Sequence, residues 1–407
     1  MGLNETPLAN RTHIGIFGRR NVGKSSLLNA VTGQNLAIVS DIKGTTTDPV
    51  SKAMELLPLG PAVLIDTPGL DDFGKLGKQR VAKAYGILNR TDIALLVSDG
   101  KMGEEERDTL LRFAEKKIPY VIVINKSEER SEQEEADIAA SYENEKNLMF
   151  VSAKTGSHIH ELKEKLATLT PKEEKVQKIV GDLLDSGDIV VLVVPIDSAA
   201  PKGRLILPQQ QVIRDCLEAG AIPVITGEKE LPEVFRSLLK KPKAVVTDSQ
   251  AFQRVADDTP KDVYLTSFSI LFSRYKGDLD QQVLGAKAIR RLKDGDCVLI
   301  SEGCTHHRQC EDIGTVKLPR WIREFTGKDV CFQFCSGTQF PEDLSKYAAV
   351  IHCGGCTLNG REMKFRLKCA KEQGVPMTNY GVAIADMHGI LDRSLEIFRG
   401  RGYERTG

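Results

Sequence analysis

A glycine-rich segment near the start of the chain constrains the fold more than any other feature. Gly18-Arg-Arg-Asn-Val-Gly-Lys-Ser25 fits the pattern G-x-x-x-x-G-K-S/T and follows the run His13–Phe17, which is apolar enough to be a buried strand. Its glycines let backbone N–H groups close around phosphate oxygens, and a helix that begins after it adds the positive end of its dipole. The segment therefore predicts an α/β domain that binds a nucleotide through its phosphates.

The residue types within this loop indicate separate roles. Lys24 is expected to reach the β- and γ-phosphates, and the hydroxyl of Ser25 is expected to ligate Mg²⁺. The other loop residues that are expected to contact the nucleotide are Gly18, Asn21, Val22, Gly23 and Ser26.

Two later elements suit the metal and the terminal phosphate. Asp66-Thr-Pro-Gly69 follows the strand-like run Ala62–Ile65, so Asp66 is expected behind Mg²⁺ and the Gly69 N–H near the γ-phosphate. A run of threonines precedes this element, and one of their hydroxyls, assigned to Thr46, is expected to complete the Mg²⁺ shell. Nucleotide contacts are expected from Thr45, Thr46 and Thr47, and catalysis from Lys24, Asp66 and Gly69.

Two further elements suit a guanine base. Asn125-Lys-Ser-Glu128 ends the strand-like run Tyr120–Ile124, and Ser152-Ala-Lys154 ends the next strand. Together with the elements above, they resemble the five sequence elements of the GTPase superfamily, in which N-K-x-D distinguishes guanine readers from ATPases. Glu128 replaces the usual Asp, and its carboxylate can still accept both guanine N–H groups. The resemblance implies that the base of GTP is held by Asn125, Lys126, Glu128, Ser152, Ala153 and Lys154.

One departure from that superfamily concerns the rate of hydrolysis. Leu70 occupies the position at which Ras-like proteins carry a water-orienting glutamine, so intrinsic hydrolysis is expected to be slow. The loop containing Asn21 resembles those of potassium-activated GTPases of the tRNA-modification and ribosome-assembly kind. That resemblance implies that Asn21 ligates a K⁺ ion placed where the charge of an arginine finger would lie, and the alternative is an ordinary turn asparagine.

Cysteine and histidine residues form a second constellation. Cys304-Thr-His306 follows the expected strand Cys297–Ser301, and His352-Cys-Gly-Gly-Cys356 follows the expected strand Ala348–Ile351. Open α/β sheets bind their ligands at the carboxyl ends of strands. Three thiolates with nearby histidines suit zinc or an iron–sulfur cluster, and the uncertain fourth ligand favours a [4Fe–4S] cluster over structural zinc. A redox disulfide and buried core thiols are the alternatives.

The cysteines outside this constellation are expected to pack as small apolar side chains. Cys297 lies in an expected strand beside Val298 and Leu299, Cys331 and Cys335 flank a Phe-Gln-Phe strand, and the other two fall on expected helices. The expectation applies to Cys216, Cys297, Cys331, Cys335 and Cys369, whereas Cys310 is left open because it lies in the loop of the constellation.

Alternating strand-like and helical stretches run along the 407 residues and predict an α/β protein of three domains. The first, at 1–170, is expected to be a P-loop GTP-binding domain with a mostly parallel sheet. The second, at 171–275, carries no catalytic motif and suits oligomerisation or spacing. The third, at 276–407, is an α/β domain that contains the cysteine constellation.

Composition excludes several classes of protein. Lys and Arg total 56, as do Asp and Glu, and the resulting net charge of zero disfavours a nucleic-acid partner. The longest strongly apolar run, Ile189–Ile196, is far shorter than the ~20 residues of a membrane span. The chain does not open on an apolar leader. We therefore expect a soluble, cytoplasmic protein with neither a membrane nor a nucleic-acid partner.

A potassium-type GTPase domain followed by C-x-H and H-C-x-x-C resembles the HydF family, the maturation GTPases of [FeFe]-hydrogenases, over essentially the whole chain. The resemblance implies a homodimer formed through the middle domain. It implies a [4Fe–4S] cluster in the third domain, on which a di-iron precursor is received from two radical-SAM maturases and passed to apo-hydrogenase. The cluster ligands implied are Cys304, Cys353 and Cys356, with His306 or His352 as the fourth.

GTP hydrolysis is then expected to bias contacts among domains or partners through the segments Gly44–Asp48 and Gly69–Gly77, and not to drive the iron chemistry. Two other functions stay open. A ribosome-assembly or tRNA-modification GTPase with structural zinc predicts a basic face, which the zero net charge disfavours. A redox switch would use Cys353 and Cys356 as a C-x-x-C dithiol and would leave Cys304 without a role.

Overall fold

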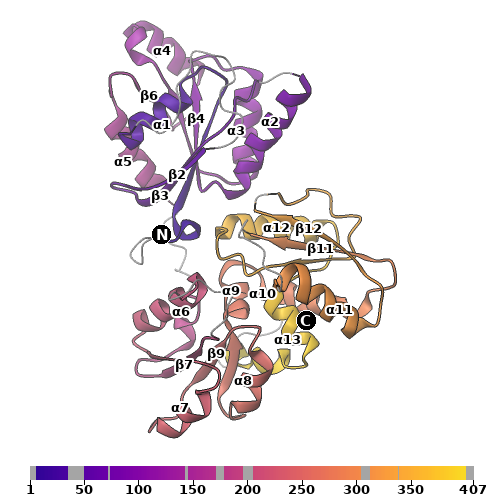
Figure 1. The fold of residues 1–407 in the computed structure, drawn as a ribbon. Coiled ribbons are helices and arrows are strands. Elements are labelled where there is room, and N and C mark those ends of the chain that lie inside the picture. Colours follow the sequence, from indigo (N-terminus) through magenta and orange to yellow (C-terminus); the bar gives the residue numbers. More distant parts are fainter. Residues whose placement is uncertain are drawn as a thin grey trace. The chain divides into compact units, whose positions relative to one another are not determined.

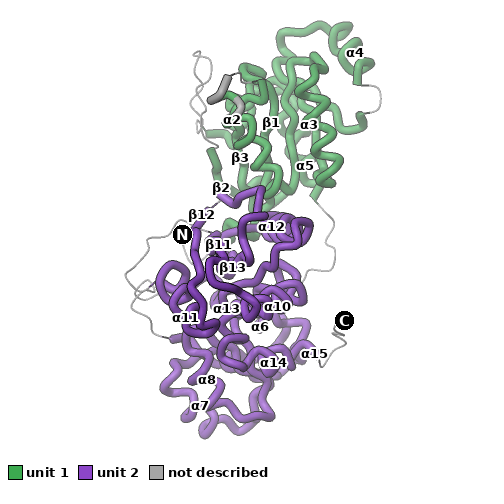
Figure 2. The backbone as a smooth tube through the Cα atoms, turned by 90° about the vertical axis from the view of Figure 1, so that its right-hand side faces the viewer, with its two compact units in different colours: residues 1–174 green, residues 175–407 purple. Residues whose placement is uncertain are grey.

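The computed structural model describes residues 6–34, 50–71, 74–142, 145–170, 178–195, 205–303, 312–337 and 339–399. The chain divides into two compact units, Met1–Glu174 and Lys175–Gly407, which Figure 2 shows in green and purple.

The first unit is built on a six-stranded sheet with the strand order β2-β3-β1-β4-β5-β6. Only β2 is antiparallel to its neighbour, and the other pairings are parallel. The strands are β1 (Thr12–Phe17), β2 (Val50–Leu56), β3 (Gly60–Asp66), β4 (Ile93–Ser98), β5 (Tyr120–Ile124) and β6 (Leu148–Phe150). The helices are α1 (Lys24–Thr32), α2 (Gly74–Gly86), α3 (Glu104–Glu115), α4 (Glu132–Ser141) and α5 (Ile159–Leu169).

Helices cover both faces of this sheet (Figure 1). Leu27 of α1 and Leu162 of α5 belong to one apolar core, and Ala84 of α2 and Phe113 of α3 belong to the other. Every residue of β4 is buried, as expected for a central strand of a sheet that is covered on both faces. The long β-branched runs in the sequence therefore have a direct structural reason.

The second unit contains two four-stranded sheets, both entirely parallel, with the orders β10-β9-β7-β8 and β12-β11-β13-β14. The strands of the first are β7 (Ile189–Val193), β8 (Ile222–Thr226), β9 (Ala244–Thr247) and β10 (Tyr264–Ser267). Those of the second are β11 (Cys297–Glu302), β12 (Cys331–Ser336), β13 (Ala349–His352) and β14 (Met377–Asn379).

Helices connect the strands of both sheets. The first sheet has α6 (Leu207–Glu218), α7 (Leu231–Ser237), α8 (Phe252–Asp258) and α9 (Phe268–Lys276). The second has α10 (Leu279–Ala288), α11 (Leu318–Thr326), α12 (Gly360–Glu372), α13 (Tyr380–Met387), α14 (Leu391–Ser394) and α15 (Glu396–Arg399). A single π-helical turn, Ile313–Lys317, precedes α11.

The end of the chain joins the core of the first of these two sheets. Leu391, Leu395 and Phe398 are buried in the same cluster as Val191 of β7 and Val245 of β9. Helices α14 and α15 also contact β10. The two sheets of the second unit are therefore linked by shared packing as well as by the chain between them.

The α/β class and the three-domain architecture expected from the sequence are confirmed. Strands β2 and β10 were not predicted from the sequence. After β14 the chain forms three helices, α13, α14 and α15. Gly389 has φ +72° between the first two of these helices, a left-handed conformation that ends α13. Among the described residues, no helix combines the length and the apolar composition needed to cross a membrane.

Candidate functional site

The phosphate loop joins the end of β1 to the start of α1, at the carboxyl edge of the parallel sheet. Gly18 and Gly23 have φ of +144° and +92°. A Cβ atom on Gly18 would lie 2.2 Å from the Val97 carbonyl oxygen, and one on Gly23 would lie 2.2 Å from Nδ2 of Asn125. Only glycine fits both positions, because backbone conformation and available space exclude a side chain.

The lysine and serine of the loop lie as their predicted roles require. Lys24 is buried, and its Nζ donates to the carbonyl oxygens of Gly18 at 2.8 Å and Arg19 at 2.7 Å, so the ammonium lies within the curve of the loop. Ser25 Oγ donates to Asp66 Oδ2 at 2.6 Å. The predicted pair of metal-binding side chains is thus brought together from α1 and β3.

The second oxygen of Asp66 has a different environment. Asp66 Oδ1 is buried and accepts no hydrogen bond from any residue that the structure describes. Burial raises the pKa of this carboxyl, while the hydrogen bond from Ser25 and the charge of Lys24 oppose the rise. A buried oxygen without a donor is costly unless a cation offsets it, and Mg²⁺ prefers oxygen ligands. The residues present therefore fit Mg²⁺.

A pocket of about 570 Å³ lies beside the loop, where the base elements converge. Asn125 is almost fully buried and braces the pocket: its Nδ2 donates to the Val22 carbonyl at 3.1 Å, and its Oδ1 accepts from the Ala153 N–H at 3.0 Å. One side chain thus joins the phosphate loop to two base elements. The predicted site residues that line the pocket are Gly23, Ser26, Asn125, Lys126, Glu128, Ala153 and Lys154.

Glu128, which replaces the usual Asp, keeps its negative charge. A hydrogen bond from Ser152, with the nearby cations of Lys154 and Arg130, holds the pKa of the Glu128 carboxyl below its usual value. Lys126 adopts a left-handed backbone with φ +64° at the turn after β5. The pocket therefore presents a carboxylate acceptor, which the predicted recognition of guanine requires.

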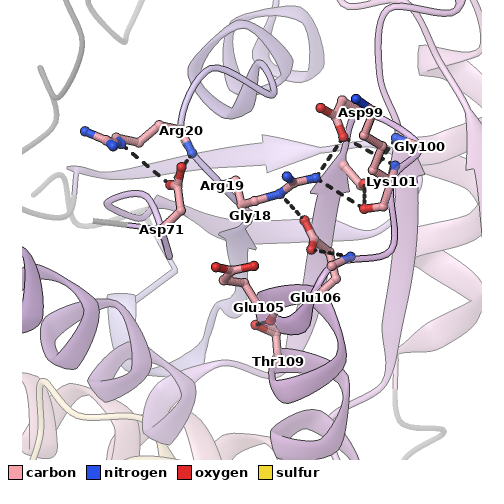
Figure 3. Close-up of polar contacts among 12 residues, drawn as sticks. Gly18, Arg19, Arg20, Asp71, Asp99, Gly100, Lys101, Glu105, Glu106 and Thr109 are labelled. Carbon is pink, nitrogen blue, oxygen red and sulfur yellow. Dashed lines mark hydrogen bonds and ion pairs between the residues drawn. The ribbon is translucent and has the colours of Figure 1, made fainter. Parts of the chain in front are cut away.

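Sequence reasoning missed a role for Arg19 in the same loop. Its Nε donates to Glu106 Oε1 at 2.6 Å, and its Nη2 donates to Asp99 Oδ1 at 2.9 Å and to the Lys101 carbonyl at 3.2 Å. Figure 3 shows this guanidinium turned toward the start of α3. Glu106 is 1% exposed and also accepts from the Gly103 N–H at 3.0 Å. Arg19 therefore ties the phosphate loop to α3.

The element that follows β3 packs against the phosphate loop. The Leu70 N–H donates to the Gly18 carbonyl at 3.3 Å, and the Leu70 side chain is buried in the core beside α2 and α3. A Cβ on Gly69 would lie 2.3 Å from Cγ of Arg20. The Arg20 N–H in turn donates to Asp71 Oδ1 at 2.7 Å (Figure 3). A buried leucine at this position has no polar group with which to orient water.

Some predicted residues lie outside the described residues. They are Thr45, Thr46 and Thr47, with the rest of the segment Gly44–Asp48, and Cys304 and His306 of the cysteine constellation. Asn21 is described, and it lies exposed in the loop with a left-handed φ of +62°. Its assignment as a K⁺ ligand stays a prediction.

The second predicted site lies at the carboxyl edge of the second sheet of its unit. Ser301 of β11 and His352 of β13 are in register, which brings the segments after both strands together. Cys353 Sγ accepts from the Gly303 N–H at 3.0 Å and from the Gly355 N–H at 3.4 Å. Such N–H···S contacts stabilise thiolate sulfur. Gly303, the last described residue before Cys304, therefore lies at the same edge of the sheet as the Cys353 loop.

A buried lysine at the end of α9 supports the loop that contains Cys353 and Cys356. Lys276, the last residue of α9, donates from Nζ to the carbonyl oxygens of Gly355 (3.2 Å), Cys356 (3.2 Å) and Leu358 (3.0 Å). Burial lowers the pKa of Lys276 to about 8, and the side chains of Cys356 and Cys353 oppose this shift. Burial raises the pKa of the Cys356 thiol, and the charge of Lys276 opposes that shift.

His352 has both ring nitrogens engaged. Its Nε2 lies 2.9 Å from Nη1 of Arg366, and its Nδ1 lies 2.7 Å from the Cys353 carbonyl oxygen. Because a guanidinium only donates, Nε2 must accept and Nδ1 must carry the proton. Burial and the charge of Arg366 lower the pKa of His352 to about 3. In this arrangement neither nitrogen of His352 is open to a metal.

Arg366 itself is fully buried. It donates to Glu362 Oε1 at 2.8 Å and to the Gly337 carbonyl at 2.7 Å, in addition to the contact with His352. Neither Arg366 nor Lys276 could be identified from a motif, because Arg366 contacts His352 and Lys276 contacts the Cys353 loop across different elements. Helix α12 carries several other charged residues, so its sequence does not single out Arg366.

The donor set fits an iron–sulfur cluster in chemistry but is incomplete in the described residues. Cys353 and Cys356 supply two soft donors on a loop that glycines allow to fold closely, and Gly355 has φ +61°. Within the described part of the chain, no group of three or more His, Cys, Asp or Glu side chains is arranged to hold a metal ion. Cys304 and His306 would have to complete the set.

The cysteines expected to pack as apolar side chains differ in their exposure. Cys216 and Cys369 are buried, which agrees with their expected packing role. Cys297 and Cys335 are only half-buried, and Cys331 is exposed, so the expectation of a core thiol is wrong for Cys331. The reason is that β12 lies at the edge of its sheet.

Comparison with known families assigns all three parts of the chain. Residues 13–126 match the model described as "50S ribosome-binding GTPase". Residues 179–277 match the "Hydrogen maturase F dimerization domain", and residues 280–397 match the "Hydrogen maturase F tetramerization domain". The last two models together match just over half of the chain.

Individual relatives resemble the first unit. GTPase Der from Wolinella succinogenes is 38% identical over 164 residues, which are 38% of this chain and 34% of the relative. The tRNA modification GTPase MnmE from Nitrosomonas europaea is 41% identical over 114 residues, or 27% of this chain and 25% of the relative. The match thus spans about a third or less of these relatives. The solved structure of Aquifex aeolicus Era bound to GDP and AlF4⁻ is 19% identical, with a TM-score of 0.36 over 55% of this chain and 97% of Era.

Proposed function

We propose that this chain is a GTPase and iron–sulfur scaffold that receives a di-iron precursor and transfers it to apo [FeFe]-hydrogenase. The chain belongs to the hydrogen maturase F family, because a GTPase domain is followed by that family's dimerization and tetramerization domains. One observation carries the proposal: the chain pairs a nucleotide site, in which Lys24, Ser25, Asp66 and Asn125 lie together, with a cysteine loop that Lys276 supports. The two sites lie in different compact units.

For GTP hydrolysis, the protein's own groups would bind and position the nucleotide. Lys24 and the loop N–H groups would hold the phosphates, and Glu128 would accept from the guanine N–H groups. Ser25 and Asp66 would hold Mg²⁺, which, when bound, neutralises charge on the β- and γ-phosphates. Because Leu70 cannot orient water, hydrolysis is slow unless further charge is supplied. We assign that charge to a K⁺ ion at Asn21.

For the iron–sulfur unit, Cys353 and Cys356 would act with Cys304 as ligands. A bound [4Fe–4S] cluster would supply the iron at which a di-iron precursor is received from radical-SAM maturases. His352 is engaged by Arg366 and by the Cys353 carbonyl, so we assign it to positioning the loop. The fourth ligand position then passes to His306 or to a group from outside the chain.

Reconstitution tests the cluster directly. Anaerobically purified protein treated with iron and sulfide is expected to bind about four iron atoms per chain and to give a reduced-cluster EPR signal. Cys353→Ser should lose both. Cys369→Ser, which changes a buried cysteine on α12, should keep both. A colourless wild-type protein that holds one zinc ion would contradict the proposal.

A colourless protein that holds one zinc ion would favour a different function. MnmE is a tRNA modification GTPase, and residues 13–126 match the model described as "50S ribosome-binding GTPase". A zinc-bearing third domain would agree with such an RNA-linked function. It would also require binding to RNA, measured by mobility shift at two salt concentrations.

Activation of apo-hydrogenase tests the proposed transfer of the di-iron precursor. Cluster-loaded protein that carries the di-iron precursor is expected to activate apo-hydrogenase, and protein treated with GTP analogues should differ in its affinity for the maturases. Equal affinity for every maturase in the GDP state and with a non-hydrolysable GTP analogue would refute the role given to GTP.

A further inference from the structure

Cys297 and Cys331 are the first residues of two neighbouring parallel strands. Cys297 begins β11 and Cys331 begins β12, and the two residues are in register. Their Sγ atoms are 2.8 Å apart. Side chains in register on adjacent strands point to the same face of a sheet, so the pair is held together by the pairing of the strands.

Solvent reaches this pair. Cys331 is exposed and Cys297 is half-buried, because β12 is the edge strand of the sheet. The Cys353 loop lies at the other end of β11, where Gly303 follows the last residue of the strand. At about 3.3 Å per residue, the length of β11 separates the two cysteine groups by roughly 20 Å. The pair is therefore distinct from the proposed cluster site.

We propose that Cys297 and Cys331 form a redox-active dithiol, which a low-molecular-weight disulfide oxidises to an intramolecular disulfide bond. A disulfide has an S–S length of about 2.05 Å, so the two sulfur atoms have to approach each other by less than ~1 Å. This proposal does not depend on the presence of a cluster.

The oxidation proceeds by two exchanges. The Cys331 thiolate attacks one sulfur of the small disulfide, forms a mixed disulfide, and releases one small thiolate. The Cys297 thiolate then attacks the Cys331 sulfur and releases the second. Both leaving thiolates take up the protons that the two cysteines lost, so two protein thiols and one small disulfide give one protein disulfide and two small thiols.

The order of attack follows from the surroundings of the two thiols. Cys331 is the exposed member, so it meets the small disulfide first. Burial and the hydrogen bond with Cys331 raise the pKa of Cys297 to about 11, so Cys297 is a poor first nucleophile at neutral pH. Once Cys331 is in the mixed disulfide, the short distance makes the second exchange intramolecular.

Peptide mapping after oxidation tests the proposal. Full-length protein is incubated without oxygen with oxidised glutathione, blocked with an alkylating agent, digested without reductant and analysed by mass spectrometry. We expect a peptide pair joined through Cys297 and Cys331 that dithiothreitol separates. The same pair should form in Cys353→Ser, which separates this chemistry from that of the cluster loop.

Single variants test the order of attack. Cys297→Ser should stop at a glutathione adduct on Cys331, and Cys331→Ser should leave Cys297 unmodified over the same time. Cys335→Ser, a change on the same strand, should oxidise like the wild type. Urea denaturation followed by far-UV circular dichroism checks that the second unit of each variant is folded.

Two outcomes would overturn the proposal. One is wild-type protein that stops at the Cys331 adduct, because the pair then cannot close. The other is wild-type protein in which neither thiol reacts while Cys353 and Cys356 do.

Discussion

At the scale of single residues, the charge of the Glu128 side chain is expected to determine the affinity for GTP. Its carboxylate is the group expected to accept from guanine, and a hydrogen bond from Ser152 keeps it charged. Glu128→Gln removes one acceptor and the charge, so we expect the affinity for GTP to fall about ten- to hundredfold. Equilibrium titration with a fluorescent GTP analogue measures this change. Glu129→Gln, the neighbouring lining residue, should change affinity little.

The pH dependence of GTP binding follows from the same group. The pKa of the Glu128 carboxyl is lowered, so the carboxylate stays charged as the pH falls through the ordinary range of glutamate and takes up its proton only below it. We therefore expect no loss of GTP affinity from this residue between pH 7 and about 5. A decline in that range that Glu128→Gln abolishes would contradict the assignment.

Arg19 is the residue that joins the phosphate loop to α3. Arg19→Ala leaves the buried Glu106 carboxylate without its cation, and we expect a loss of about 1–3 kcal/mol in the stability of the first unit. Thermal unfolding of the full chain should show a lower midpoint for that unit, together with weaker GTP binding. Arg107→Ala, an exposed change on the same helix, is the control and should change stability by less than about 0.5 kcal/mol.

At the scale of elements, α9 connects the two sheets of the second unit. The helix ends at Lys276, whose ammonium holds three carbonyl groups of the Cys353 loop. A residue matched to the dimerization domain thus supports a loop matched to the tetramerization domain. This contact gives a physical route by which packing of the middle sheet influences the cysteine loop.

Lys276→Met tests whether this contact affects the proposed cluster. Removing a buried cation beside the thiolates should lower the iron retained after reconstitution and make the reduction potential more negative, because the oxidised cluster gains relative stability. Iron analysis and an EPR-monitored redox titration measure both effects. Lys287→Met on α10, an exposed position, should match the wild type. Unchanged iron and potential in Lys276→Met would show that the contact is only structural.

At the scale of the whole molecule, the last helices complete a core that begins about two hundred residues earlier in the chain. Phe398 of α15 is 2% exposed, packs in the cluster around β7 and β9, and lies under the guanidinium of Arg274 at 5.7 Å. The middle sheet therefore needs the carboxyl end of the chain for its stability.

Phe398→Ala tests whether the middle sheet depends on α15 for its stability. A buried phenylalanine truncated to alanine costs about 3–5 kcal/mol, so we expect a marked fall in the free energy of unfolding of the second unit. Urea denaturation followed by far-UV circular dichroism measures it, and the transition of the first unit should not move. Leu239→Ala, a change at a fully exposed leucine, should have almost no effect.

Local patterns in the sequence determined the phosphate loop, the strands and the α/β class. They succeeded because a left-handed glycine, a β-branched run and a strand-to-helix turn depend on neighbouring residues only. Asp66, Ser25 and the base elements could be assigned because their spacing along the chain reflects the ends of parallel strands. The same reasoning located the cysteine loop at the end of β13.

Only the tertiary structure decided which distant groups meet. Asn125 braces the phosphate loop across 103 residues, and Lys276 reaches the cysteine loop across 79 to 82 residues. The position of β12 at a sheet edge, which exposes Cys331 beside Cys297, is equally invisible to local composition. Such contacts depend on how sheets and helices pack, and residues close in the sequence carry no record of that packing.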